Sequence, residues 1–460
     1  MWEMLWPMGT AFIIALVLTP IFRDIFHSYN VVDRPGFRKV HAYPIPRLGG
    51  VAVAFAFTVA LVRSPDSGNG VLWKLLPGAA VIVLTGILDD FFNLPAKLKL
   101  VCQILAAGVA YASGLRVDVV DGHVLPLAAS LPLTVFWLLL ATNALNLIDG
   151  LDGLCAGIGL VGSAAFWAAG LVQGNLALVW ATPPLMGALL GFLFYNFSRA
   201  TMFLGDSGAL LIGFLTGCYG IMFAGRTTGF GLLGPLMILA VPLVDLSLSI
   251  VRRSILRRPI FGADRGHIHH RLVERVRTSR RAVRVLLLWG SVGAIFALLL
   301  SVSPNLAWQA AVVLAFCATT GVGVKQLRYS EFEVAAKLLI GGEFRRTLAE
   351  KARIQNLAGS LERCETESEW WNLLVIAGRE AGWSGLVWMR GRSVVREQTL
   401  APREAFPGWS FDVPLADDEF LRVDGGLEPE GPSLDLTAFA RAVHASFAAR
   451  RWAWERPAVS

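Results

Sequence analysis

Charged residues are scarce in this chain of 460 residues. Only 16% are Asp, Glu, Lys or Arg, and 55% are hydrophobic. An ordinary soluble domain has about 25% charged and roughly 45–50% apolar residues. The composition therefore excludes a wholly soluble globular protein.

Cysteine is also rare. The five cysteines form no CxxC pair, and four of them lie inside apolar runs, so neither a disulfide framework nor a zinc site is indicated. The first apolar segment, Trp6 to Phe22, follows Glu3 and has no basic residues before it. We therefore expect a spanning helix there and not a cleaved signal peptide.

Long apolar runs fill the first two thirds of the chain. A helix needs about 20 apolar residues to cross a bilayer, with a range near 17–25. The sequence predicts about eleven transmembrane helices, at residues 4–22, 48–63, 71–88, 99–114, 125–142, 153–173, 176–195, 203–224, 229–251, 285–303 and 306–324. The second and third of these runs are short or interrupted by glycine, so ten spans is an alternative count.

The positive charge is concentrated in one segment. The net charge is +7, and the stretch Arg252–Arg284 holds eleven Arg against Asp264 and Glu274. When the loops between the spans are numbered from the N-terminus, the odd-numbered loops carry most of the other Lys and Arg residues of the loops. The even-numbered loops carry few. Because Lys and Arg favour the cytoplasmic side of short loops, we expect the N-terminus outside and the C-terminus inside.

The composition becomes that of a soluble region after Val324. We predict two domains, a transmembrane domain over residues 1–324 and a cytoplasmic part over 325–460. The second part begins with a charged helical stretch. Residues 370–383 and a periodic pattern from Leu436 to Phe447 predict helices, and residues 385–389 and 409–413 predict strands. The fold class is an all-α polytopic membrane protein with a small C-terminal cytoplasmic α/β domain.

Polar residues gather at one end of the predicted spans. Ionisable groups at membrane depth usually mark a site or a satisfied internal pair. By the loop charges, all of them fall near the cytoplasmic face, from five separate segments: Asp89, Asp90, Asn143, Asn146, Asp149, Asp152, Asn196, Asp206, Asp245, His267, His269 and His270. We favour a structural role for Asp245, as a buried partner of Arg252 or Arg253. Each of the other signals alone fits an ordinary turn or loop, but their convergence on one layer predicts a site.

The chemistry of this layer suits a phosphate-containing substrate. Carboxylate and amide oxygens are ligands for Mg²⁺, which commonly also binds substrate phosphates. Arg and His are natural phosphate partners. A soluble phosphorylated donor and a lipid acceptor could meet at such a boundary. No nucleic-acid partner is expected.

Five ordered motifs resemble one enzyme family. They are DRPGFRKVHAYPIPRLGG, LDDFFNLPAKLKL, NALNLIDGLDGL, FLGDSGALLIGF and PLVDLSLSIVRR with IFGADRGHIHHRL. These are similar to the motifs of the polyprenyl-phosphate N-acetylhexosamine-1-phosphate transferases, glycosyltransferase family 4. The resemblance implies an eleven-span helical fold in a bacterial inner membrane and an active site that faces the cytoplasm.

The same resemblance implies roles for individual residues. Asn146 and Asp206 match metal positions, for Mg²⁺ or alternatively Mn²⁺, and Asp89 matches the first acid of a motif that handles the acceptor phosphate. The remaining catalytic positions are Asp90, Asp149, Asp152, His269 and His270. The implied substrate-binding positions are Asn196, Lys99, Arg38, Lys39, His41, Arg47, Arg265 and His267.

The implied reaction transfers a sugar-1-phosphate from a UDP-N-acetylhexosamine to undecaprenyl phosphate and releases UMP, which would initiate a cell-envelope glycan. The HIHHRL motif resembles the branch that uses UDP-N-acetylglucosamine. The alternatives are a phospho-N-acetylmuramoyl-pentapeptide transferase, a multi-span transporter and a membrane scaffold for the soluble tail. One-step and two-step mechanisms both stay open, as do the glycan pathway and the oligomeric state, a homodimer included.

Overall fold

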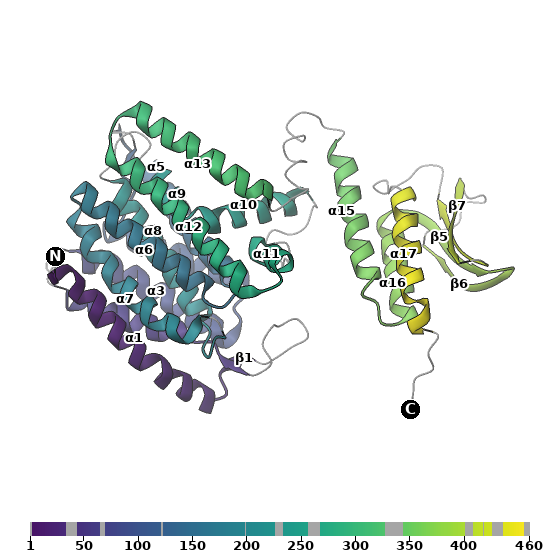
Figure 1. The fold of residues 1–460 in the computed structure, drawn as a ribbon, viewed down its shortest axis with the longest axis horizontal. Helices are drawn as coiled ribbons and strands as arrows, with labels where there is room; N and C mark the ends of the chain where they lie inside the picture. Colours follow the sequence, from purple (N-terminus) through teal and green to yellow (C-terminus); the bar gives the residue numbers. More distant parts are fainter. Residues whose placement is uncertain are drawn as a thin grey trace. The chain divides into compact units, whose positions relative to one another are not determined.

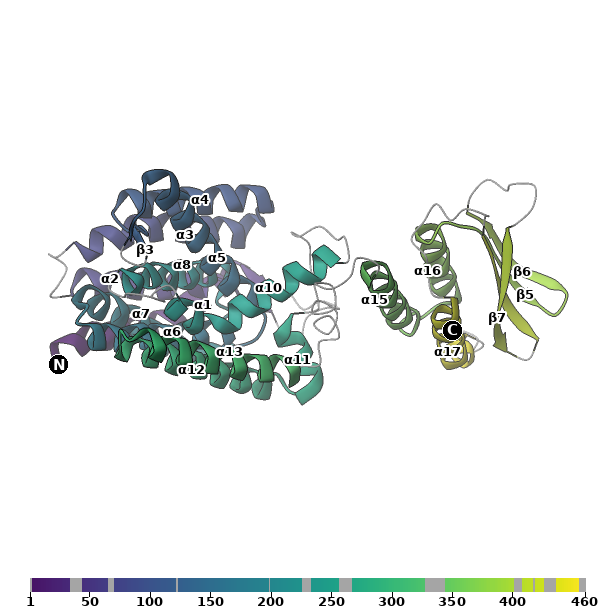
Figure 2. The same cartoon turned by 90° about the horizontal axis from the view of Figure 1, so that it is seen from above.

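A computed structural model describes residues 2–33, 44–64, 70–120, 123–197, 199–225, 233–255, 267–326, 344–400, 408–416, 418–425 and 436–454. The chain divides into two compact units (Figures 1 and 2). The membrane unit contains residues 1–251 and 260–328, and the C-terminal unit contains residues 329–460 together with 252–259.

The membrane unit is almost entirely helical. Its first six helices are α1 (Trp2–Ser28), α2 (Gly49–Val62), α3 (Val71–Phe92), α4 (Ala96–Ala112), α5 (Leu127–Ile148) and α6 (Leu154–Gln173). The others are α7 (Leu176–Asn196), α8 (Gly205–Ala224), α9 (Leu233–Ile238), α10 (Ala240–Ile255), α11 (Ile268–Val276), α12 (Ser279–Val302) and α13 (Leu306–Gln326). Two short antiparallel pairs lie in loops, β1 (Val32–Asp33) with β2 (Ile45–Pro46) and β3 (Val119–Val120) with β4 (His123–Val124).

Eight of the described helices are long and apolar enough to cross a membrane: α1, α3, α5, α6, α7, α8, α12 and α13. The protein is therefore a multi-pass membrane protein. The second and fourth predicted spans coincide with the shorter helices α2 and α4. The ninth is divided into α9 and α10 near Leu239. Pro242 explains this break, because a proline ring clashes with the carbonyl group four residues earlier, that of Ile238.

Helix α8 lies inside the group of helices, where it contacts α2, α3, α5 and α6 (Figures 1 and 2). It is the most buried of the eight candidate spans. Small residues permit this packing: a Cβ atom added at Gly50 of α2 would lie 2.0 Å from the Gly208 nitrogen of α8. A Cβ atom at Gly86 of α3 would lie 2.4 Å from the Cα atom of Ser207. Such close approach of backbones is common between helices in membranes, and here it fixes the N-terminus of α8.

The C-terminal unit has an antiparallel sheet with the strand order β6-β5-β8-β7. Its elements are α15 (Phe344–Leu361), α16 (Glu367–Glu380), β5 (Trp383–Arg390), β6 (Ser393–Thr399), β7 (Trp409–Ala416), β8 (Glu419–Gly425) and α17 (Leu436–Trp454). Helices α16 and α17 lie on one face of the sheet (Figure 2). Between them is a core that includes Trp370, Trp388 and Phe447.

The secondary structure of this unit differs from the prediction in two respects. The predicted helix over 370–383 ends at Glu380, and Trp383 begins β5. Gly382 has a φ of +72°, a left-handed conformation that commonly terminates a helix. Strands β6 and β8 were missed, since β6 is an exposed edge strand and β8 begins with Glu419. That buried carboxylate is paired, because it accepts hydrogen bonds from Trp388 Nε1 at 3.1 Å and Arg390 Nε at 2.8 Å.

Candidate active site

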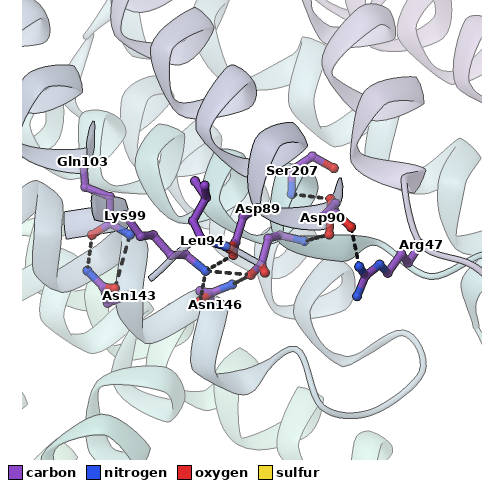
Figure 3. A network of polar contacts seen from close by, with 10 residues as sticks. Arg47, Asp89, Asp90, Leu94, Lys99, Gln103, Asn143, Asn146 and Ser207 are labelled. Carbon is purple, nitrogen blue, oxygen red and sulfur yellow. Dashed lines mark hydrogen bonds and ion pairs between the residues drawn. The ribbon is translucent and has the colours of Figure 1, made fainter. Parts of the chain in front are cut away.

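Three polar side chains from three helices of the membrane unit converge on the ammonium group of Lys99, which lies on a fourth helix, α4. The distances from Lys99 Nζ are 2.7 Å to Asp89 Oδ2, 3.0 Å to Asp206 Oδ1 and 3.4 Å to Asn146 Oδ1. Asn146 Nδ2 also donates a hydrogen bond to Asp206 Oδ1. Figure 3 shows Lys99 extending toward Asp89 and Asn146. We call Asp89, Lys99, Asn146 and Asp206 the lysine cluster.

A second layer of contacts lies behind the lysine cluster. Gln103 follows Lys99 by one helical turn on α4, and Asn143 precedes Asn146 by three residues on α5. The two amides exchange hydrogen bonds, at 2.8 Å from Asn143 Nδ2 to Gln103 Oε1 and at 3.3 Å in the other direction (Figure 3). This pair links α4 to α5 beside the lysine cluster (Figure 3).

Asp90 caps the N-terminus of α8. Its two carboxylate oxygens accept hydrogen bonds from the backbone N–H groups of Asp206 at 2.9 Å and Ser207 at 3.1 Å. A carboxylate at this position satisfies otherwise unpaired donors and interacts favourably with the helix dipole. The Arg47 guanidinium donates to the Asp90 carbonyl oxygen. Asp90 therefore sets the orientation of Asp206.

Gly205 makes this cap possible. Its φ is +74°, and an added Cβ atom would lie 1.9 Å from the Arg47 carbonyl oxygen. No other residue type could occupy this position without moving the loop that carries Arg47. The glycine of the FLGDSG motif thus brings Arg47, Asp90 and Asp206 together.

The DGLDG segment between α5 and α6 holds the connection from α7 to α8. Asn196 Oδ1 accepts a hydrogen bond from the Gly153 N–H at 2.9 Å, and Asn196 Nδ2 donates to the Met202 carbonyl at 3.0 Å. Asp152 Oδ2 accepts from the Ala200 N–H at 3.0 Å. Asn196 and Asp152 therefore lie together, as their motifs predict, and each has a visible structural function.

Asp149 directly follows the last residue of α5. The residue as a whole is partly exposed, but its carboxyl group is withdrawn from water. This desolvation, together with the negative charges of Asp206, Asp90 and Asp152, raises the pKa of Asp149 well above its usual range. A cation that entered the space between these acids would lower the pKa again.

The three histidines have different environments. His267 and His269 are buried with their Nδ1 atoms 3.2 Å and 3.6 Å from Asp245 Oδ2. Asp245 Oδ1 accepts a hydrogen bond from the Ile268 N–H at 2.7 Å. Asp245 thus has the buried structural role that we expected, with histidines as its partners. A Cβ atom at Gly150 would lie 2.4 Å from His269 Nε2, so His269 packs against the DGLDG segment, whereas His270 lies on a cavity.

That cavity, of about 890 Å³, is lined by half of the predicted site residues. The predicted residues that line it are Arg47, Asp90, Asn146, Asp149, Asp152, Asn196, Asp206 and His270. Four predicted residues, Asp89, Lys99, His267 and His269, do not line it and lie behind its wall. Four others, Arg38, Lys39, His41 and Arg265, lie outside the described residues.

Several cavity residues were missed by the sequence reasoning: Asp33, Arg199, Thr278, Ser279 and Arg280. Arg280 belongs to the arginine-rich stretch Arg252–Arg284. No sequence signal marked Arg199, which lies between the two recognised positions Asn196 and Asp206. Its place depends on how the segment between α7 and α8 closes.

Among the described residues, no group of three His, Cys, Asp or Glu side chains has the geometry of a metal site. The oxygens of the lysine cluster nevertheless converge on a cation, the Lys99 ammonium. Carboxylate and amide oxygens are the ligand types that Mg²⁺ takes. Asn146 and Asp206 also face the cavity, so these two residues are suited to hold an ion from that side.

Comparisons with known proteins decide the family. The model of glycosyl transferase family 4 matches residues 72–224. A probable undecaprenyl-phosphate N-acetylglucosaminyl 1-phosphate transferase of Bacillus subtilis is 35% identical over 300 residues, which cover 63% of this chain and 84% of that protein. The chain belongs to glycosyl transferase family 4.

Two other relatives of this family 4 protein have similar names. Decaprenyl-phosphate N-acetylglucosaminephosphotransferase of Mycobacterium tuberculosis is 34% identical over 348 residues, 68% of this chain and 86% of that protein. Undecaprenyl-phosphate alpha-N-acetylglucosaminyl 1-phosphate transferase of Escherichia coli is 30% identical over 276 residues, 56% of this chain and 74% of that protein. The family resemblance read from the five motifs is confirmed.

Proposed function

We propose that this family 4 protein transfers N-acetylglucosamine-1-phosphate from UDP-N-acetylglucosamine to a polyprenyl phosphate such as undecaprenyl phosphate. The products are a polyprenyl-diphosphate sugar and UMP. The names of the relatives support the transferred group and the acceptor. The observation that carries the proposal is the cavity in which residues of all five motifs meet, with carboxylates and cationic side chains on its walls.

Charge is the main obstacle to this reaction. An anionic acceptor phosphate must attack an anionic diphosphate, and two unit charges about 4 Å apart repel by about 4 kcal/mol at an effective dielectric constant of 20. Cationic side chains such as Arg47 and Arg280 on the cavity wall offset this repulsion. Positioning and electrostatic stabilisation are the main contributions of proteins to phosphoryl-type transfer. The two-step alternative requires an aspartate nucleophile, and Asp90 is unsuited to it because both of its oxygens accept backbone hydrogen bonds.

Asn146 and Asp206 are the residues that we propose to hold Mg²⁺, with Mn²⁺ as the alternative ion. When bound, the ion would neutralise charge on the diphosphate and on the leaving UMP. The contacts of Lys99 with Asp206 and Asn146 fix the direction of both side chains. Asp89 in turn fixes Lys99, since its other carboxylate oxygen is occupied by the Leu94 N–H at 2.7 Å. A role for Asp89 in handling the acceptor phosphate stays a prediction.

We further propose eleven spans in a bacterial inner membrane, with the N-terminus outside and the C-terminal unit and the cavity on the cytoplasmic side. The loop charges support this orientation. It would bring a soluble nucleotide donor and a membrane-bound acceptor to the same cavity.

The test is release of UMP by the purified full-length protein with undecaprenyl phosphate and each of two donors, UDP-N-acetylglucosamine and UDP-N-acetylmuramoyl-pentapeptide. We expect UMP only with the first donor, loss of UMP after chelation with EDTA, and recovery with Mg²⁺. Asp206→Asn should reduce turnover at least 100-fold while the protein keeps its unfolding temperature. UMP formation with the pentapeptide donor alone, or solute uptake by vesicles without UMP, would contradict the proposal.

A further inference from the structure

Arg199 is a cavity residue that none of the motifs includes. It lies on the segment between α7 and α8, its side chain is exposed, and it lines the cavity of about 890 Å³. Its φ is +88°. This left-handed region is uncommon for residues with a side chain and favours glycine, so the backbone at Arg199 is strained.

Hydrogen bonds on both sides hold this conformation in place. The N–H of the next residue, Ala200, donates to Asp152 Oδ2 at 3.0 Å. The Thr201 N–H donates to the Tyr195 carbonyl at 2.8 Å, and the Met202 carbonyl accepts from Asn196 at 3.0 Å. A strained residue persists only where its surroundings fix it, and such residues cluster at functional sites.

The other basic side chains on the cavity wall already interact with other groups. Arg47 donates to the Asp90 carbonyl oxygen, and Arg280 and His270 each interact with other residues. Within the described part of the chain, the Arg199 side chain has no hydrogen bond or ion pair. Its guanidinium group presents a planar set of donors that matches two phosphate oxygens.

Acidic side chains outnumber the other basic ones on the cavity wall. Asp33, Asp90, Asp149, Asp152 and Asp206 all line it. Those of them that are ionised would repel an anionic substrate unless cationic groups faced it. The strained backbone at Arg199 places an unpaired guanidinium group on this cavity, where it can contact a phosphate that enters.

We propose that Arg199 is a binding residue for a phosphate group in the cavity, and that Asp152 is a positioning residue that holds the segment carrying it. The inference rests on the proposed function, which supplies two sources of that phosphate. One is the diphosphate of the nucleotide donor, and the other is the phosphate of the lipid acceptor. A bidentate contact with either would form when the substrate binds.

The test uses Arg199→Gly, which removes the guanidinium group and also relieves the backbone strain. We expect the unfolding temperature in detergent to stay the same or to rise, because glycine accepts a positive φ without cost. The KM for one substrate should rise about tenfold or more, as for the loss of a charge-assisted contact, with a smaller change in kcat. Arg199→Lys, which keeps the charge but not the planar pair of donors, should lie between the wild type and Arg199→Gly.

Arg277→Gly is the matched control. Arg277 is also an exposed arginine with a positive φ, of +61°, at the end of α11, and it does not line the cavity. Its replacement should leave both KM values within twofold of the wild type. A rise confined to the KM for UDP-N-acetylglucosamine assigns the contact to the donor diphosphate, and a rise confined to the KM for undecaprenyl phosphate assigns it to the acceptor.

The inference is overturned if Arg199→Gly keeps both KM values within twofold, or if its activity falls only in proportion to a loss of folded protein. Calorimetric titration with UDP and with inorganic pyrophosphate provides a readout that needs no turnover. Absence of UMP release by the wild type would refute the proposed function. Wild-type turnover with an unchanged Arg199→Gly variant would refute only this inference.

Discussion

The amide pair of Gln103 and Asn143 gives a quantitative prediction about the lysine cluster. Gln103 is only 2% exposed, and its contact with Asn143 joins α4 to α5 (Figure 3). Lys99 lies one turn before Gln103, so a shift of α4 against α5 would move the Lys99 ammonium. We therefore expect this pair to hold Lys99 within reach of Asp89, Asn146 and Asp206.

The perturbation is Gln103→Leu, which keeps a similar volume and removes both hydrogen bonds to Asn143. Hydrogen bonds between helices in membranes contribute about 0.6 kcal/mol on average and at most about 1.7 kcal/mol. Asn143 Nδ2 keeps its contact with the Leu139 carbonyl at 2.8 Å. The loss of two bonds should therefore lower the free energy of unfolding by about 1–2 kcal/mol.

Asn143→Leu removes the same pair, so the double variant should be little less stable than either single variant. The coupling energy of that cycle should be about 1–2 kcal/mol. Displacement of a catalytic group by about 1 Å can cost roughly 100-fold in rate. A smaller displacement of Lys99 should cost less, so we expect kcat of Gln103→Leu to fall about 10- to 100-fold. Either KM should change less than kcat.

The assay is UMP release at saturating concentrations of both substrates, combined with denaturant unfolding in detergent. Gln173→Leu is the control, because Gln173 Nε2 contacts Ser301 Oγ at 3.5 Å between α6 and α12, far along the chain from the lysine cluster. It should leave kcat unchanged. A normal kcat in Gln103→Leu, or a coupling energy below about 0.3 kcal/mol, would refute this reasoning.

Substitutions at three further positions test the packing around the cavity. Gly50→Ala should push α2 away from Gly208 and reduce both the unfolding temperature and kcat; wild-type values for both would contradict the close contact. Asp90→Leu removes both acceptors of the helix cap and should lower the free energy of unfolding by about 1–3 kcal/mol. Asp90→Asn keeps an oxygen for one backbone N–H and should lower it less. Equal denaturant midpoints for the two variants would contradict the helix cap. Asp245→Leu leaves a buried N–H group without its acceptor and should lower the free energy of unfolding by a similar amount. It should also raise the KM for the nucleotide donor, because His269 would move. An unchanged KM would mean that Asp245 contributes to folding alone.

The sequence predicts the helices of the membrane unit well, because the length and polarity of an apolar run are local properties. Each of the eleven runs coincides with one or more helices. Local properties do not reveal where a helix ends or where packing against neighbouring helices breaks it into two. The break near Leu239 depends on a proline that the hydropathy pattern treats as part of the run. Strand β8 was missed because Glu419 looks like a surface residue and is in fact buried against Trp388 and Arg390.

The candidate site was predicted as a list of residues, and the structure shows why a list is incomplete. Asp89 and Asp90 are adjacent in the sequence, but successive side chains on a helix point about 100° apart. Asp89 faces Lys99 of α4, and Asp90 faces the N-terminus of α8. One motif therefore supplies a partner for the lysine cluster and a helix cap, which are different functions.

The histidine motif shows the same separation. His269 is 2% exposed and packs between Asp245 and Gly150, whereas its neighbour His270 lines the cavity. A buried histidine beside a carboxylate can fix the position of α11, and an exposed one can contact a substrate. We therefore expect His270→Ala to raise the KM for the donor without a change in stability. His269→Ala should mainly lower the unfolding temperature, since it leaves a void against the DGLDG segment. If both variants unfolded at the wild-type temperature with the same rise in KM, the division between a supporting and a contacting histidine would be wrong.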